Sequence, residues 1–270
     1  MTAVHAATTL PTVPSGNPMS LEGRVIVVTG AAQGIGRAIA ERAVSLGARV
    51  ALVDLQDEAL KAVEAALGDR AKAYVGSVAD PSFVAAAVAD AETHFGGLHG
   101  LVNNAGITRT ALIEKMTLDE WNAVISVHLT GAFLFTQAVG RTMIARVKAG
   151  DPVAGAIVNV SSDAGVQGTF GQINYGAAKA GMLGAAMSAA REWARFGIRA
   201  NSVAFGVVET PMTETVRGDK FRDTYLAKIP LGRFTLPDEA ATPVCFLLSD
   251  GASYITGQRL SVNGGFHMGA

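Results

Sequence analysis

Three polar side chains near the middle of the chain have types and spacings that suit proton transfer. Tyr175 and Lys179 are four residues apart, so a helix would place the phenol and the ammonium on one face. A neighbouring cation favours ionisation of a phenol, whose pKa is normally near ~10, and a lowering by about 3 units corresponds to roughly 4 kcal/mol. We therefore expect Tyr175 to act as a general acid or base. Ser162 lies thirteen residues earlier and would hold a substrate oxygen and stabilise its developing charge.

A glycine-rich segment lies between a predicted buried strand and a predicted helix. Residues 29–36 read Thr-Gly-Ala-Ala-Gln-Gly-Ile-Gly. Gly30 permits a tight turn, Gly34 leaves room for a pyrophosphate against the backbone, and Gly36 lets the helix pack closely on the sheet. The helix N-terminus then offers N–H groups to the phosphates. The segment predicts a dinucleotide site. By themselves, Tyr175 and Lys179 could simply lie on the face of an amphipathic helix, but their combination with this segment and with Ser162 makes a catalytic role the better explanation.

An acidic side chain stands where the adenosine ribose of a dinucleotide would be recognised. Asp54 ends the second predicted strand, and a carboxylate there would accept hydrogen bonds from the ribose hydroxyls of NAD. The 2′-phosphate of NADP would meet this negative charge, which is unfavourable. Gln33, Leu55 and Gln56 are best placed to offset the charge, and none is basic. The sequence therefore favours NAD over NADP. Arg37 on the first predicted helix argues the other way, because its positive charge could offset a 2′-phosphate. Alternatively, Asp54 is an ordinary turn residue that caps the following helix.

These residues need a scaffold that brings distant segments together, and the hydrophobic pattern predicts one. From residue 21 onward, short β-branched runs alternate with longer helical stretches, which is typical of a Rossmann-type α/β fold with a doubly wound parallel sheet. The predicted strands cover residues 24–29, 49–54, 71–75, 100–103, 155–161, 199–204 and 259–262. The predicted helices cover residues 34–46, 57–67, 81–95, 118–148, 173–196 and 237–249. We expect about seven strands, helices on both faces, and ligands at the carboxyl ends of the strands.

The pattern predicts a single catalytic domain over residues 21–270. Residues 1–20 are rich in Thr, Pro and Ala and are expected to form a flexible tail. Residues 205–235 interrupt the alternation and are rich in Thr, Gly and charge. They are expected to form either a surface excursion or a mobile lid over the site.

Composition and charge argue against several classes of protein. The net charge is −1, so no electrostatic footprint for nucleic acid is expected. The apolar stretches are judged too short to span a membrane, and the start of the chain lacks the features of a secretory signal. The five histidines have no metal-ligand spacing, so no metal site is expected. The single cysteine, Cys245, lies in an apolar run and indicates a core residue in a reducing, cytoplasmic setting.

Together these motifs resemble those of the short-chain dehydrogenase/reductase family in its single-domain branch. The matching segments are TGAAQGIG (29–36), NNAG (103–106), the serine at 162, YGAAK (175–179), VETP (208–211) and GQRLSVNGG (257–265). The resemblance covers residues 21–268. It implies a nicotinamide cofactor and a homotetramer or homodimer built on long helices.

The resemblance also implies roles for further residues. Ile35 would touch the phosphate and ribose region, Val208 and Thr210 the carboxamide, and Lys179 the ribose beside the nicotinamide. Asn103, Ala105 and Gly106 would border the cofactor and steady the central sheet. The residues expected at the cofactor are Gly30, Gln33, Gly34, Ile35, Gly36, Asp54, Ser77, Val78, Asn104, Ala105, Gly106, Tyr175, Lys179, Val208 and Thr210.

Three residues depart from the pattern of that family. His128 stands where the family commonly has Asn; it either preserves the same helix distortion or titrates and adds pH dependence to a proton relay from the lysine. Ser77 replaces the usual Asp at the adenine, which would then be held largely by the backbone of Val78. Phe205 replaces the usual Pro after the sixth strand and either shapes the nicotinamide end of the pocket or simply packs.

The substrate pocket is expected to form from three segments, residues 108–111, 163–172 and 208–229. Most of its expected side chains are apolar, namely Val166, Phe170, Met212, Phe221, Tyr225 and Leu226. Such a surface fits a hydrophobic or partly polar secondary alcohol or ketone. Asp163 would discriminate against anionic substrates or is a turn residue.

The expected function is hydride transfer between NAD(H) and a secondary alcohol or ketone. Ser162, Tyr175 and Lys179 are the catalytic candidates, with His128 as a fourth. The nearest alternative is an NADPH-dependent reductase of 3-oxoacyl thioesters on acyl carrier protein or coenzyme A, to which the chain is also similar; Asp54 disfavours NADPH. An alternative of another class is a non-catalytic NAD-binding sensor or scaffold, and the intact catalytic trio argues against it.

Overall fold

The computed structural model describes residues 16–269, and within them seven parallel strands form one sheet in the order β3-β2-β1-β4-β5-β6-β7. The strands are β1 (Val25–Thr29), β2 (Arg49–Asp54), β3 (Ala71–Val75), β4 (Gly100–Asn103), β5 (Ala156–Ser162), β6 (Arg199–Phe205) and β7 (Arg259–Val262). Every residue of β1 is buried, because helices cover the sheet on both sides, and this explains why its sequence is a continuous apolar run. The predicted Rossmann-type α/β fold is confirmed.

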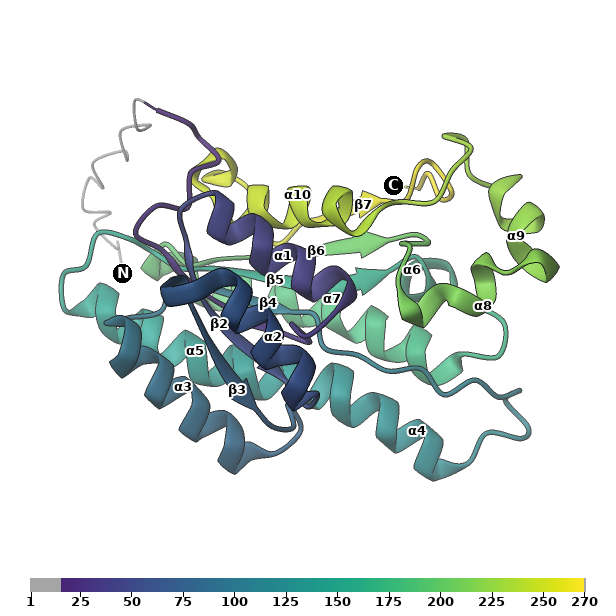
Figure 1. Cartoon of the computed structure of the whole chain (residues 1–270), viewed down its shortest axis with the longest axis horizontal. Helices are drawn as coiled ribbons and strands as arrows, with labels where there is room; N and C mark the ends of the chain where they lie inside the picture. The colour runs from purple at the N-terminus through teal and green to yellow at the C-terminus, as the bar shows by residue number, and fades with distance from the viewer. Residues whose placement is uncertain (1–15, 270) are drawn as a thin grey trace, which may run out of the picture.

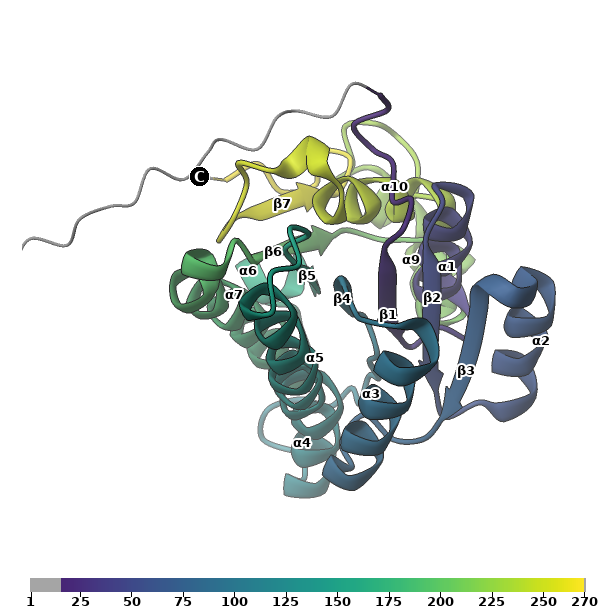
Figure 2. The same cartoon turned by 90° about the vertical axis from the view of Figure 1, so that its left-hand side faces the viewer.

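The helices form a layer on each face of the sheet (Figures 1 and 2). On one face lie α1 (Gly34–Ser45), α2 (Asp57–Leu67) and α10 (Pro237–Leu248). On the other face lie α3 (Pro81–Phe95), α5 (Gly131–Lys148) and α7 (Ile173–Trp193). Each layer has its own core, in which fully buried side chains such as Ile39 and Phe135 pack against the strands.

The strand order creates the position of the site. From β1 the chain moves outward to β2 and β3 and then returns to β4 on the other side of β1. The loops that follow β1 and β4 therefore diverge at the carboxyl edge, where open α/β sheets bind their ligands. β5 pairs with β4 in parallel and brings Ser162 to the same edge.

The predicted helix over 118–148 is not regular throughout. α4 (Leu118–Ile125) joins α5 through a π-helical turn at Ser126–Thr130, which contains His128. Such turns often mark functional sites. Contrary to the expectation from sequence, the run Leu118–Lys148 is long and apolar enough to cross a membrane by length and composition. This is weak evidence for a membrane span, since core helices satisfy the same test, and α5 packs against β4 and α3.

The segment between β6 and α10 is more regular than its composition suggests. It contains α8 (Glu214–Arg217) and α9 (Asp219–Leu226), and a parallel bridge between Val208 and Thr235 brings its ends together. The short helix α6 (Ala164–Gln167) was also not predicted.

Near the start of the described residues, Gly251 N–H donates to the carbonyl of Pro18 at 2.8 Å. Contacts with the domain therefore begin before the predicted boundary at residue 21. Residues 1–15 of the predicted tail lie outside the described residues.

Candidate active site

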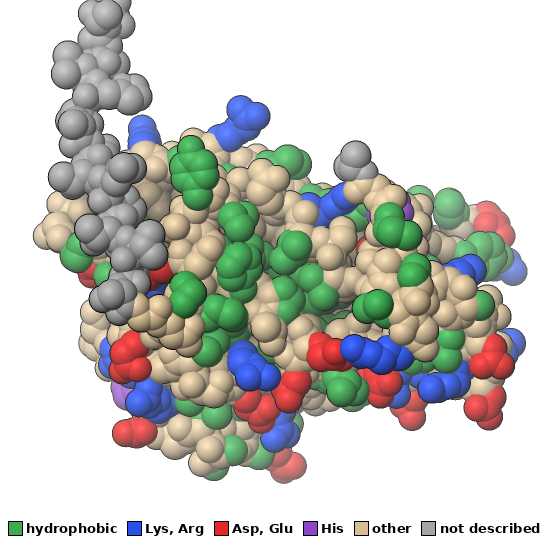
Figure 3. All heavy atoms as spheres, turned by 90° about the horizontal axis from the view of Figure 1, so that it is seen from above, with side chains coloured by type: hydrophobic (Ala, Val, Ile, Leu, Met, Phe, Trp, Pro, Cys, Tyr) green, Lys and Arg blue, Asp and Glu red, His purple; other side chains and the backbone are tan. Residues whose placement is uncertain are grey.

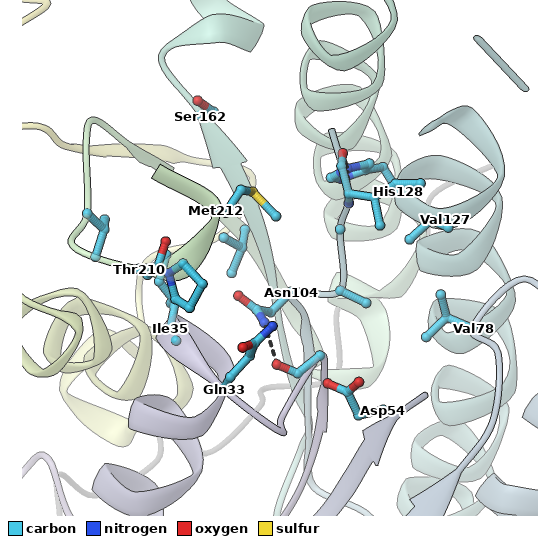
Figure 4. A pocket seen from close by; sticks show the side chains of 18 of the residues that line it. Gln33, Ile35, Asp54, Val78, Asn104, Val127, His128, Ser162, Thr210 and Met212 are labelled. Atoms are coloured by element: carbon cyan, nitrogen blue, oxygen red, sulfur yellow. Dashed lines mark hydrogen bonds between the residues drawn. The ribbon is translucent and has the colours of Figure 1, made fainter. Parts of the chain in front are cut away.

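A cavity of about 390 Å³ opens at the carboxyl edge of the sheet (Figure 4). Asp54 lies towards one end and Ser162 towards the other, with Asn104 and His128 between them. Every residue expected at the cofactor lines this cavity except Gly36 and Asn103. Segments far apart in the sequence therefore meet where the strand order predicts a ligand site.

The glycine loop has the backbone shape that its sequence predicts. Gly30 and Gly34 have positive φ angles of +68° and +56°, a region that favours glycine. Gly36 has another role: a Cβ at this position would lie 2.0 Å from the carbonyl oxygen of Gly30. It therefore lets α1 begin against the turn, and the expectation that it borders the cavity is corrected.

Asn104 links this loop to the end of β4. Its Nδ2 donates to the carbonyls of Thr29 at 3.0 Å and Gly30 at 3.1 Å, while Thr29 Oγ1 accepts from the backbone N–H groups of Asn104 and Ala105. Asn103 points elsewhere, since its Nδ2 donates to Asn159 Oδ1 and Thr136 Oγ1. Asn103 therefore links β4 to its neighbours in the fold, whereas Asn104 shapes the cavity.

The carboxylate of Asp54 is held at the edge of the cavity by the backbone. Its Oδ2 accepts from Ala32 N–H at 3.0 Å and its Oδ1 from Gln56 N–H at 3.1 Å. Arg37 instead donates through Nε to Glu41 at 2.7 Å, one turn along α1. Among the described residues that line this end of the cavity, none is basic.

The catalytic candidates meet at the other end. Ser162 ends β5, and Tyr175 and Lys179 lie on α7, with the Lys179 Nζ 5.5 Å from the centre of the tyrosine ring. Lys179 is 3% exposed, and its Nζ donates to the carbonyl of Val160 at 2.6 Å. The three side chains converge on one wall of the cavity.

Burial dominates the protonation of this pair. It lowers the pKa of Lys179 from 10.5 to about 7. It also raises the pKa of Tyr175, while a hydrogen bond with Ser162 acts in the opposite direction. From the sequence we expect the ammonium, helped by the positive nicotinamide ring of NAD⁺, to lower the pKa of the phenol; the protein's own contribution acts in the opposite direction, because desolvation disfavours the charged forms of both groups.

His128 is held in the π-turn with 1% of its surface exposed. Its Nε2 lies 2.9 Å from Ile107 N and 2.8 Å from Ile107 O, so it accepts from the amide in one tautomer and donates to the carbonyl in the other. Its ring also packs edge-on against Tyr175, with centroids 5.2 Å apart. Burial lowers the pKa of His128 to about 3. The geometry thus favours a neutral ring that preserves the local backbone over a group that titrates.

Comparison with known proteins gives consistent results. A family model described as enoyl-(acyl carrier protein) reductase matches residues 30–267. The chain is 43% identical over 250 residues to the 3-oxoacyl-[acyl-carrier-protein] reductase of Salmonella typhimurium, covering 93% of this chain and 100% of that protein. It is 44% identical to the corresponding reductase of Thermotoga maritima, covering 92% and 99%. A solved structure described as a short-chain alcohol dehydrogenase from Sinorhizobium meliloti superposes with a TM-score of 0.86 at 35% identity, covering 93% of this chain and 98% of the other.

The chain belongs to the short-chain dehydrogenase/reductase family. Within this short-chain dehydrogenase/reductase, Asn174 is a site residue that the motif did not reveal. It is fully buried, and its Nδ2 donates to the carbonyls of Arg109 and Glu120 at 3.0 and 3.2 Å. It anchors the N-terminus of α7, and so Tyr175, to α4 and to the loop before it. A polar residue directly before the tyrosine was the available signal.

The predicted substrate pocket of this short-chain dehydrogenase/reductase is only partly assembled. Met212 lines the cavity, as does Phe205, which is 3% exposed and so both packs and shapes the wall. Phe170 is 88% exposed and lies outside it, as does Phe221. Val166, Tyr225, Leu226 and Asp163 are also absent from the lining. The expectation for these residues is corrected, because none of them contributes to the lining of the cavity.

Proposed function

We propose that this protein interconverts a 3-oxoacyl thioester and the corresponding 3-hydroxyacyl thioester by hydride transfer with NAD(H). The observation that carries the proposal is the convergence of Ser162, Tyr175 and Lys179 on a cavity whose other end carries Asp54. The named activity of the similar reductases supports the thioester over the wider class of secondary alcohols and ketones.

The residues present fit a nicotinamide dinucleotide. The N-terminus of α1 and the glycine loop suit its pyrophosphate, and a Cβ at Gly34 would lie 3.2 Å from Thr210 Cγ2 across the cavity. Asp54 would accept from the ribose hydroxyls at one end, and Val208 and Thr210 would contact the carboxamide at the other. When bound, the reduced cofactor supplies the hydride.

The side chains at the catalytic end supply the remaining chemistry of reduction. The Ser162 hydroxyl would hold the substrate carbonyl oxygen and stabilise its developing charge. The raised pKa of Tyr175 keeps its hydroxyl protonated, so it can donate a proton to that oxygen. Lys179, held by Val160, would orient the cofactor ribose, and its positive charge would stabilise the phenolate that remains when Tyr175 gives up its proton.

Asp54 favours NAD(H) over NADP(H). Reductases of 3-oxoacyl thioesters usually take NADPH, so this is the feature in which the chain would differ from them. The carboxylate accepts hydrogen bonds from two backbone N–H groups. None of the described residues that line this end of the cavity carries a positive charge. A 2′-phosphate would meet unbalanced repulsion there.

Assembly into a homodimer or homotetramer in the cytoplasm also belongs to this proposal. Apolar side chains gather over the centre of the face that carries α10 and β7 (Figure 3). Tyr254 and Leu260 are exposed at this edge, and Phe133 is 57% exposed on α5. Exposed apolar surface of this kind suits contact with a second copy.

The direct test is an assay of purified protein with acetoacetyl-CoA, with NADH and NADPH in parallel. We expect consumption of the thioester with kcat/KM at least about tenfold higher for NADH. Tyr175→Phe should lower kcat by about 10²–10⁴-fold with little change in NADH affinity. Reduction of simple ketones alone would reject the thioester, and a preference for NADPH would reject the cofactor assignment. Binding of NADH without turnover of any carbonyl substrate would favour the non-catalytic alternative.

A further inference from the structure

Asp163 directly follows Ser162 but does not line the cavity. It is 5% exposed, and its Oδ1 accepts from Asn263 Nδ2 at 3.0 Å. Its Oδ2 is buried and has no hydrogen-bond partner within residues 16–269. Burial raises the pKa of this carboxyl, and Asn263, His267 and Arg259 act in the opposite direction. Burying an acidic group with an unpaired oxygen costs free energy, so its presence here calls for a structural or functional explanation.

Asn263 connects this carboxyl group to the C-terminal turn, defined here as residues 263–268. An ionised carboxylate only accepts hydrogen bonds, so it selects the orientation in which the Asn263 amide nitrogen faces it. In that orientation Nδ2 also donates to the carbonyl of His267 at 3.0 Å, and Oδ1 accepts from Gly265 N–H at 3.0 Å. The turn therefore folds around one amide that Asp163 orients.

The C-terminal turn packs against residues 208–235, which lie between β6 and α10 and are called the lid. The contact is with the last part of the lid. The carbonyl of Gly264 accepts from Leu231 N–H at 3.1 Å. Gly265 has a φ of +87°, and a Cβ there would lie 2.8 Å from Pro230 Cγ. Two adjacent glycines thus allow the turn to approach the lid closely.

A second contact ties the same turn to α9 of the lid. Phe266 stacks on Tyr225, with ring centroids 6.3 Å apart and planes 10° from parallel. The first part of the lid borders the cavity through Thr210, Met212 and Thr213. Contacts from Asp163 through the turn therefore reach one end of the lid, at residues 225–231, while its other end borders the cavity.

We propose that Asp163 is a positioning residue for substrate binding: by orienting Asn263, it keeps the C-terminal turn folded and the lid in place over the cavity. It acts on substrate affinity rather than on proton transfer, because the contacts it controls lead to the lid and not to Tyr175. Only the choice of test substrate rests on the proposed function; the connection to the lid does not.

Kinetics of three variants and one double variant test the connection. Asp163→Val removes the carboxylate acceptor of Asn263 and should raise KM for acetoacetyl-CoA about 10-fold, with kcat within about 2-fold of wild type. Asp163→Asn retains an acceptor and should restore KM. Phe266→Leu should also raise KM, and its combination with Asp163→Val should have no larger effect than the stronger single change, since both act on one route. Additive effects, or a fall in kcat alone, would overturn the proposal.

Hydrogen exchange of lid amides provides a readout that needs no substrate. Asp163→Val and Phe266→Leu should both speed exchange in α9 by about 10-fold and leave α3 unchanged. Asn201→Ala is the matched control, because this buried amide holds Ile255 and Gln258 without contacting the turn. It should lower Tm but not lid protection. If acetoacetyl-CoA is not turned over, the proposed function fails while this exchange experiment still decides the role of Asp163; unchanged lid exchange would reject it.

Discussion

At the scale of single residues, the two ends of the cavity carry charged groups of opposite sign in different surroundings. Asp54 is a partly exposed carboxylate held by two backbone N–H groups. Lys179 is a buried ammonium whose one strong acceptor is the carbonyl of Val160. The Asp54 carboxylate keeps some contact with solvent, whereas burial disfavours the charged form of Lys179.

Removing the carboxylate of Asp54 should weaken discrimination between the cofactors. For Asp54→Ala we expect the ratio of kcat/KM for NADH over NADPH to fall about tenfold, equivalent to about 1.4 kcal/mol of lost repulsion. Asp57→Ala is the matched control, because Asp57 pairs with Lys61 on the exposed side of α2. Steady-state kinetics with both cofactors give the ratio. An unchanged ratio in Asp54→Ala would contradict its role.

Lys179 should make stability depend on pH in a defined direction. Its pKa is about 7 in the fold against an ordinary value of 10.5, so between these values the unfolded chain binds more protons than the folded one. The free energy of unfolding therefore rises with pH across this window, and Lys179→Met removes that contribution. The Tm of the variant minus that of wild type should be largest near pH ~6 and smaller near pH ~10. Thermal unfolding at both pH values measures it; a difference independent of pH would show that the ammonium is not desolvated.

At the scale of elements, α1 and the π-turn position the cavity walls by close contact. Gly36 allows α1 to begin against the carbonyl of Gly30. Gly36→Ala should cost about 1–3 kcal/mol through overpacking, lowering Tm by several degrees and weakening NADH binding. Gly184→Ala on α7 is the control, because its added Cβ meets nothing within 4 Å and it should gain up to ~1 kcal/mol of helix propensity. Calorimetry of both variants separates the two effects, and equal shifts in Tm would refute the packing argument.

The π-turn should hold a neutral histidine across the working pH range. Since the pKa of His128 is about 3, its ring does not change charge near neutrality. His128→Asn should therefore leave the pH profile of kcat unchanged between about pH 6 and 9. His128→Ala leaves Ile107 without its side-chain partner and should lower kcat without moving the profile. A pH profile displaced in His128→Asn would show that the ring titrates during turnover.

At the scale of the whole molecule, exposed apolar side chains on α5 and α7 predict assembly with further copies of the chain. Phe133 on α5 and Met187 on α7 are 57% and 50% exposed. Native mass spectrometry should show a dimer or tetramer, and Phe133→Glu should halve its mass because a charge is costly to bury in an apolar contact. Val75→Glu, 41% exposed at the end of β3, is the control and should leave the mass unchanged. A monomeric wild-type protein would contradict the expected assembly.

Local patterns in the sequence determined the strands, most helices, the glycine loop and the tyrosine–lysine spacing. They did so because burial period, positive φ and helical repeat are properties of neighbouring residues. Tertiary structure alone decided that burial raises the pKa of Tyr175 and that Gly36 faces Gly30 rather than the cavity. It also decided that Asp163 bonds to a residue one hundred positions away. Desolvation and long-range hydrogen bonds depend on which segments meet, and that is a property of the packed domain.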